Sequence, residues 1–311
     1  MRRFAPFALV LTLGLAPDPT PTPPPPPAMI DLRFIRMKIS AGDLDSAESI
    51  LEVHRAEKGE DGEYVLGVAW LARGAALLGD WASASRYAKA AHDIALSRLG
   101  SAPDWENQAE AQYALGTAIE VEAQVLAASG RKADAIRYLD ENAKTWEKAP
   151  YNLRARIWKR RNQLDLVGQK APELRADDQV GTGFSGLEAL RGRPVVLFFW
   201  WESCGDCKAE AAALRRIVAK YVPRGVSFVA PTRIYGENPG EEKAKIEKAW
   251  SEVYGSPATV TVPISDQAMV RYGVSATPTF VFVDRNGIVT AYLPYRMTDE
   301  RLSSEIEKLL R

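Results

Sequence analysis

The stretch VVLFFWWESCGDCKAEAAALRR, residues 195–216, contains both cysteines of the 311-residue chain. Its first part, VVLFF (195–199), is a continuous apolar run, which is typical of a strand buried on both faces. Residues 206–222 then repeat apolar side chains at helical spacing. Cys204 and Cys207 therefore lie between a buried strand and the start of a helix. They could form a redox pair, half of a metal site, or a structural crosslink.

The metal site and the crosslink are the weaker interpretations. A zinc site needs about four ligands, and this spacing supplies two. The chain has no third cysteine, and its two histidines, His54 and His92, lie in the other half. A crosslink over a four-residue loop would add only about 2 kcal/mol of stability. We therefore expect no metal here.

The redox interpretation has a mechanism. Unpaired amides and the dipole at a helix N-terminus favour the thiolate of Cys204. That thiolate would attack a partner disulfide, and Cys207, one turn on, would resolve the mixed disulfide. A CxxC motif between a strand and a helix favours this redox pair.

The rest of this half supplies further strands and helices. VSFVA (226–230) and TFVFV (279–283) read as buried strands. Asn286-Gly287 is a tight-turn signal that joins the second of these to residues 288–293 as a hairpin. Helical patterns cover residues 240–255, 266–272 and 299–310. We predict an α/β domain whose sheet is mostly parallel with one antiparallel edge.

Residues 168–311 resemble the thioredoxin superfamily, and more narrowly its TlpA-like extracytoplasmic thiol–disulfide oxidoreductases. Cys204-Gly205-Asp206-Cys207 matches the active-site motif, and VSATPTF (274–280) matches a loop with a cis-proline. The resemblance implies a protein-disulfide oxidoreductase without a cofactor, in which Thr277 and Pro278 face the disulfide. Its partners would be a client protein with a disulfide or thiol pair and an upstream electron-donor thiol protein.

The sequence departs from that family at three positions. Ser203 replaces the usual tryptophan before the first cysteine, and Gly-Asp replaces a dipeptide that usually contains proline. Phe198 stands where thioredoxins bury a proton-relaying aspartate, so Cys207 needs water or another group for proton transfer. Glu202 is the nearest candidate, unless it is a solvated loop carboxylate. We count Trp201 and Asp206 with it as supporting residues.

The first half is predicted to be an all-α array of helical hairpins over residues 29–161. Three Gly-Asp or Gly-Arg turns are each followed by an alanine one turn into the next helix, at 42–47, 79–84 and 130–135. This arrangement resembles tetratricopeptide repeats, whose usual period is 34 residues. The spacings here are irregular, so the repeats would be degenerate. The chain is thus expected to be a multidomain protein, with an α/β thioredoxin fold from 168 to 311.

The N-terminus has the layout of a secretory signal peptide. MRRFAP carries two arginines, an apolar core follows, and small residues close the segment 1–16. The apolar run is too short to span a bilayer, so we expect no membrane span in the mature chain. Residues 17–28 are rich in proline and predict an extended linker. We expect a periplasmic or secreted protein.

The net charge of the chain is zero. Forty lysines and arginines balance forty acidic residues, which gives no reason to expect nucleic acid. The sequence favours an extracytoplasmic thiol–disulfide oxidoreductase whose helical domain binds the client or a partner. One alternative is a helical-repeat binding or assembly protein with a weakly active thioredoxin domain. The other is a peroxiredoxin-like peroxidase, which is disfavoured because Gly205 stands where its threonine should be.

Overall fold

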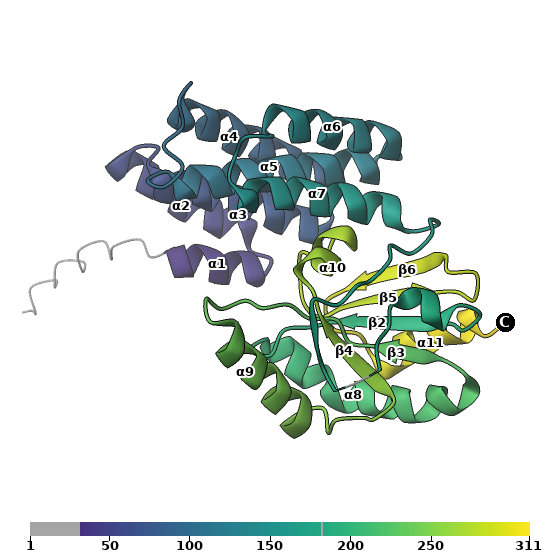
Figure 1. Ribbon diagram of the computed structural model, residues 1–311. Helices are drawn as coiled ribbons and strands as arrows, with labels where there is room; N and C mark the ends of the chain where they lie inside the picture. Colours follow the sequence, from purple (N-terminus) through teal and green to yellow (C-terminus); the bar gives the residue numbers. More distant parts are fainter. Residues whose placement is uncertain (1–31, 182) are drawn as a thin grey trace, which may run out of the picture.

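The computed structural model describes residues 32–181 and 183–311, and it has a helical part and a sheet-containing part (Figure 1). The predicted signal peptide and proline-rich linker lie outside the described residues. The helical part consists of α1 (Leu32–Ser40), α2 (Leu44–Lys58), α3 (Gly62–Leu78), α4 (Trp81–Leu99), α5 (Ala109–Ala128), α6 (Lys132–Thr145) and α7 (Tyr151–Leu166). None of the described helices is both long enough and apolar enough to cross a bilayer.

The predicted helix turns are confirmed. Each falls between two helices, and each has a glycine with positive φ: Gly42, Gly79 and Gly130. The side chains of Asp43 and Asp80 cap the helices that follow the first two turns. The alanines one turn later are all fully buried: Ala47, Ala84 and Ala135. Small side chains at these positions let neighbouring helices pack closely.

The sheet has six strands within the described residues, in the order β1-β4-β3-β2-β5-β6. The strands are β1 (Asp178–Val180), β2 (Val195–Phe199), β3 (Ser227–Val229), β4 (Val260–Ile264), β5 (Thr279–Val283) and β6 (Val289–Pro294). The helices of this part are the short η1 (Leu187–Leu190) and η2 (Val222–Arg224) with α8 (Gly205–Tyr221), α9 (Pro239–Glu252), α10 (Asp266–Arg271) and α11 (Asp299–Leu309).

The α/β class was predicted correctly, but the expected strand directions were wrong. Only β2–β3 and β3–β4 pair in parallel, whereas β1–β4, β2–β5 and β5–β6 are antiparallel. Both edges of the sheet are therefore antiparallel. The prediction missed β1 and β4 as strands, and it had no means to place β5 beside β2.

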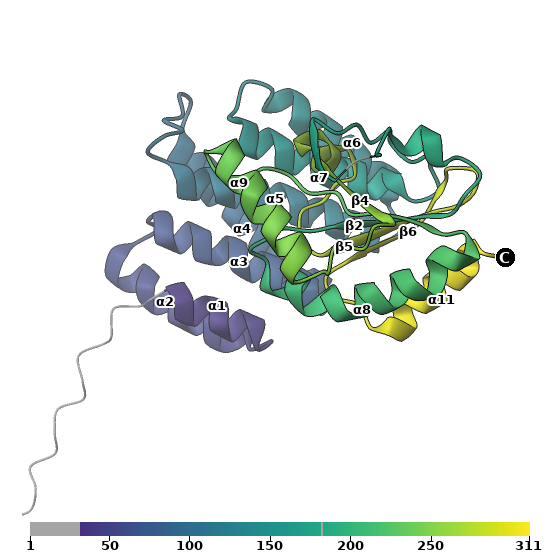
Figure 2. The same cartoon turned by 60° about the horizontal axis from the view of Figure 1, so that its bottom comes forward.

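The two faces of the sheet have separate apolar cores. Alternate residues of β2 enter each core, with Phe198 on one face and Leu197 on the other. The helices α8, α9 and α11 cover the first face, and Figure 2 shows α8 and α11 side by side along it. Helix α10 and Leu166, the last residue of α7, cover the second face.

The helical part contacts the second part mainly through α7, which lies against α10 and β6. The Tyr151 hydroxyl donates to Asp266 Oδ2 at 2.5 Å, and the Asn162 side-chain amide donates to the Val270 carbonyl at 3.0 Å. Residues 162–166, which the sequence placed beyond the helical segment, are helical and belong to this contact. The two parts therefore meet through a specific polar interface.

Candidate active site

Strand β2 delivers the two cysteines to the N-terminus of α8. Cys204 is the N-cap residue of that helix, and its sulfur accepts a hydrogen bond from the Cys207 backbone N–H at 3.1 Å. The pair forms a disulfide, with a Cα–Cα distance of 5.2 Å. Cys204 is partly exposed, whereas Cys207 is 0% exposed. Of the two cysteines, only Cys204 is therefore accessible to another molecule.

The loop before β5 lies against the disulfide. The peptide bond between Thr277 and Pro278 is cis, and the Cys204 sulfur lies 3.4 Å from the Thr277 carbonyl oxygen. The backbone N–H of Tyr295 donates to the Pro278 carbonyl at 2.8 Å and the Thr279 hydroxyl donates to the Ala276 carbonyl at 2.7 Å. The structure thus brings Thr277 and Pro278 beside the cysteines, where the resemblance placed them.

The loop between β2 and the cysteines is packed into the protein. Glu202 is only 6% exposed and accepts a hydrogen bond from the Ser203 hydroxyl, so it is not a solvated loop carboxylate. Its second oxygen has no hydrogen-bond partner within the described residues. The Trp201 ring lies 4.9 Å from the ring of Tyr235, centroid to centroid. Trp201 and Glu202 therefore pack beside the motif, while Asp206 is exposed on the first turn of α8.

Glu210 is a candidate that the sequence reasoning missed. It is 1% exposed and lies one turn after Cys207 on the same face of α8. Burial raises the pKa of its carboxyl group, because the charged form loses water. The sequence pattern could have revealed it, because Glu210 lies at helical spacing from Leu214 and Ile217 on the buried face of α8. A carboxylate on that face is unusual enough to mark it.

The position of the thioredoxin aspartate is apolar here. Phe198 packs against Tyr254 and Phe280, with ring centroids 5.8 and 5.0 Å away. The Tyr254 hydroxyl donates to the Cys207 carbonyl at 2.9 Å, and this hydrogen bond holds the first turn of α8 in place. Burial raises the pKa of Tyr254, so this hydroxyl stays protonated.

One group among the described residues brings three metal-ligating atoms within 4.8 Å of one another: His54, Asp61 and Glu63. It lies in the helical part. Asp61 caps α3 by accepting from the Tyr64 N–H at 2.8 Å, and its Oδ1 also lies 2.8 Å from His54 Nε2. The cap and this contact account for the approach of His54 and Asp61.

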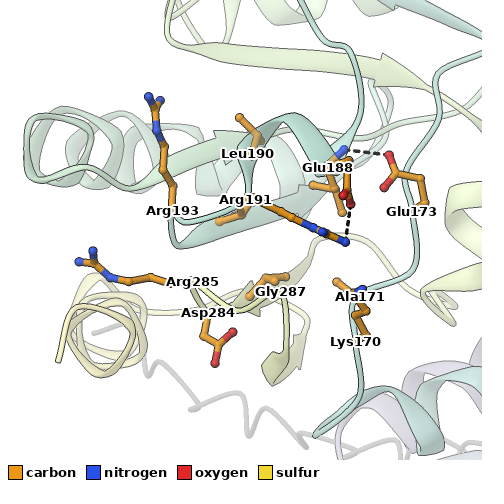
Figure 3. Close-up of a pocket in the computed structure, with 13 residues that line it drawn as sticks. Lys170, Ala171, Glu173, Glu188, Leu190, Arg191, Arg193, Asp284, Arg285 and Gly287 are labelled. Carbon is orange, nitrogen blue, oxygen red and sulfur yellow. Dashed lines mark hydrogen bonds and ion pairs between the residues drawn. The ribbon is translucent and has the colours of Figure 1, made fainter.

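A small cavity of about 40 Å³ lies at the other end of β2 from the cysteines (Figure 3). Val195 at the start of β2 and Val283 at the end of β5 line it. Next to it Glu173 accepts from the Leu187 N–H at 3.0 Å, and Glu188 pairs with Arg191 at 2.8 Å. The cavity has room for water but no contact with the redox site.

Comparisons with known proteins find relatives of the half of the chain that contains the cysteines. A sequence model described as the AhpC/TSA family matches residues 167–292. The thiol-disulfide oxidoreductase ResA of Geobacillus thermodenitrificans is 30% identical over 143 residues, which are 46% of this chain and 78% of that protein. The thiol:disulfide interchange protein DsbE of Escherichia coli is 25% identical over 127 residues, 40% of this chain and 63% of that protein.

A solved structure from Chlorobium tepidum, assigned as a thiol:disulfide interchange protein DsbE, is also similar. It is 29% identical and covers 47% of this chain and 98% of its own, with a TM-score of 0.40.

A CxxC disulfide at a helix N-terminus, next to a cis-proline loop, defines a thioredoxin-like protein-disulfide oxidoreductase. The chain belongs to the family of thiol–disulfide oxidoreductases represented by ResA, and its residues 167–292 match the AhpC/TSA family model.

Proposed function

We propose that this protein reduces disulfides of client polypeptides through its Cys204-Gly205-Asp206-Cys207 motif. The asymmetry of the pair carries the proposal, because Cys204 is accessible and Cys207 is completely buried. A buried second thiol is protected from client disulfides and can react only with the sulfur of its neighbour. Cys204 is therefore the attacking residue and Cys207 the resolving one.

The reaction begins with the reduced pair. The Cys204 thiolate attacks one sulfur of the client disulfide, and the other client sulfur leaves as a thiolate. Cys207 then loses its proton and attacks the Cys204 sulfur, which forms the 204–207 disulfide and releases the second client sulfur. Two electrons pass to the client. An upstream thiol protein must reduce the pair again before the next cycle.

The proton of Cys207 needs a nearby acceptor. We assign this role to Glu210, because it is buried one helical turn from Cys207 and its raised pKa brings it nearer to that of a thiol. Glu202 is the other buried carboxylate of the region, and its unpartnered oxygen keeps it a candidate.

The proposed compartment is outside the cytoplasm. The signal-peptide pattern of residues 1–16 supports export, and a periplasmic or extracellular location would supply client disulfides. The helical part, with its resemblance to tetratricopeptide repeats, would bind the client or a partner and hold it near the cis-proline loop.

Cysteine variants test the proposal in an insulin-disulfide reduction assay with dithiothreitol as donor. Cys204→Ser abolishes the rate above background, because the accessible nucleophile is lost. Cys207→Ser accumulates mixed disulfides through Cys204, since no resolving thiol remains. Trapping of insulin chains on Cys207 in the Cys204→Ser variant would reverse the roles. A wild-type protein that leaves insulin oxidised would leave the assembly-protein alternative standing.

The match to the AhpC/TSA family makes a peroxidase the second candidate. A peroxidatic cysteine needs a thiolate that hydrogen peroxide can reach. Cys207 is buried, and Cys204 already has its partner one turn away. We expect hydrogen peroxide consumption with a thiol donor to stay near the rate of the Cys204→Ser variant.

A further inference from the structure

A second cavity, of about 170 Å³, lies between the two parts of the protein. Arg73 of α3 and Arg160 and Gln163 of α7 line one side. Ser275 and Ala276 of the cis-proline loop line the other side. Tyr295, just after β6, completes the rim. The cavity therefore exists only because the helical part docks beside the redox site.

Among the described residues, two arginines and no acidic residue line the cavity, so its wall carries positive charge. Three guanidinium groups, on Arg73, Arg156 and Arg160, act on the one buried carboxylate of Glu120. Arg156 donates two hydrogen bonds to this carboxylate. Its Nε and a terminal nitrogen lie 3.0 and 2.5 Å from the same oxygen. Neither of the other two arginines has a carboxylate oxygen within 4.0 Å in the part of the chain that the structure describes.

Arg160 is the clearer of these two groups. Its Nε atom is buried and lacks a hydrogen-bond partner among the described residues, while a terminal nitrogen donates to Gln163. Burial lowers the pKa of Arg160, because its charge is kept from water. A partly buried cation without a direct ion pair is costly to the folded protein, and an anion in the cavity would offset that cost.

The chemistry of the lining fits a carboxylate. A guanidinium presents planar N–H donors that match the two oxygens of a carboxylate. Tyr295 lies close enough to act on the charges of both Arg73 and Arg160, so its hydroxyl can add another donor. The Gln124 and Gln163 amides are available at the same wall.

The cavity is close to the attacking sulfur. Thr277, whose carbonyl lies 3.4 Å from the Cys204 sulfur, directly follows Ala276 in the lining. Consecutive Cα atoms are about 3.8 Å apart, so Ser275 and Ala276 are within about 8 Å of Thr277 along the backbone. An extended client bound at Cys204 covers that distance with two or three residues.

We propose that this interdomain cavity is a carboxylate-binding subsite, which selects client polypeptides with Asp or Glu two or three residues from the reactive cysteine. The inference rests on the proposed disulfide reductase and adds the class of client. It also gives the helical part a direct role, because Arg73 and Arg160 come from its helices.

Two synthetic disulfide peptides test the subsite, identical except for Glu or Gln three residues from the cysteine. We expect wild-type protein to reduce the Glu peptide with a kcat/KM about tenfold higher, since one charge-assisted hydrogen bond is worth about that factor. Arg160→Gln brings the ratio close to one, and Arg73→Gln does the same from another helix.

Arg161→Gln is the matched control. Arg161 neighbours Arg160 on α7 but pairs with Asp140 and Asp165, at 3.2 and 3.0 Å, so this variant keeps the wild-type ratio. Equal rates for both peptides with wild-type protein would overturn the subsite and leave the reductase standing. Reduction of neither peptide would overturn the reductase itself. A preference that survives in Arg73→Gln and Arg160→Gln would place recognition elsewhere.

Discussion

Gly273 lies against the backbone of α7, and Gly273→Ala tests the docking of the two parts of the protein. Gly273 follows α10 and has a φ of +65°. A Cβ atom there would overlap the backbone carbonyl of Lys159 and lie 2.6 Å from the backbone nitrogen of Gln163. Both atoms belong to the backbone of α7, so no side chain can turn away to make room.

Two costs add in this variant. A left-handed backbone conformation costs a non-glycine residue about 1–2 kcal/mol, and overpacking a close contact costs about 1–3 kcal/mol. We expect Gly273→Ala to lower the free energy of unfolding by about 2–5 kcal/mol. Urea titration followed by tryptophan fluorescence measures it, as a change in midpoint at constant slope.

Gly225→Ala is the matched control for the backbone term. Gly225 has a φ of +89°, and a Cβ atom there would have no heavy atom within 4 Å. We expect this variant to lose only about 1–2 kcal/mol. If both variants lose the same free energy, α7 does not rest on Gly273 in solution, and the interdomain cavity loses its basis.

Three further predictions concern the redox part. Residues 166–311 alone should unfold cooperatively in urea, because the two cores of this part include no residue before Leu166; a broad, gradual transition would contradict this. Asp206→Asn should lower the pKa of Cys204, since a carboxylate in the motif opposes the thiolate. An unchanged thiolate absorbance titration refutes that reasoning. Burial raises the pKa of Glu210 in the folded protein. Its charge therefore destabilises the fold once the pH rises above the pKa that Glu210 has in the unfolded chain. Glu210→Gln should therefore raise the free energy of unfolding at pH 7 but not at pH 3, and equal effects at both pH values would refute it.

The sequence predicted the elements around the cysteines well because their signals are local. The run 195–199 is apolar at every position, and the structure buries all five residues as β2. The three glycine turns of the helical part were equally readable, since each needs positive φ. Strand β4 was missed because its run is short and contains Pro263 near its end.

The sequence does not show which residues that are remote in the chain lie close together in the fold. Arg73, Arg160 and Ser275 are far apart in the chain. The packing of the helical part brings the two arginines together, and the docking of α7 on α10 adds Ser275 to the same cavity. The strand directions have the same origin, because the position of β5 beside β2 depends on the whole sheet. The burial of Glu202 also follows from tertiary packing, so the alternative that it is a solvated loop carboxylate was wrong.

The central claim is that Cys204 and Cys207 form a two-electron couple that donates electrons to client disulfides. The reduction potential of the pair, measured by equilibration with glutathione redox buffers, tests it most directly. Asp206 in the motif opposes a strongly stabilised thiolate, so we predict one two-electron couple below about −200 mV, nearer to thioredoxin at about −270 mV than to DsbA at about −120 mV. A potential near that of DsbA, or a pair that does not titrate as a single couple, would contradict it.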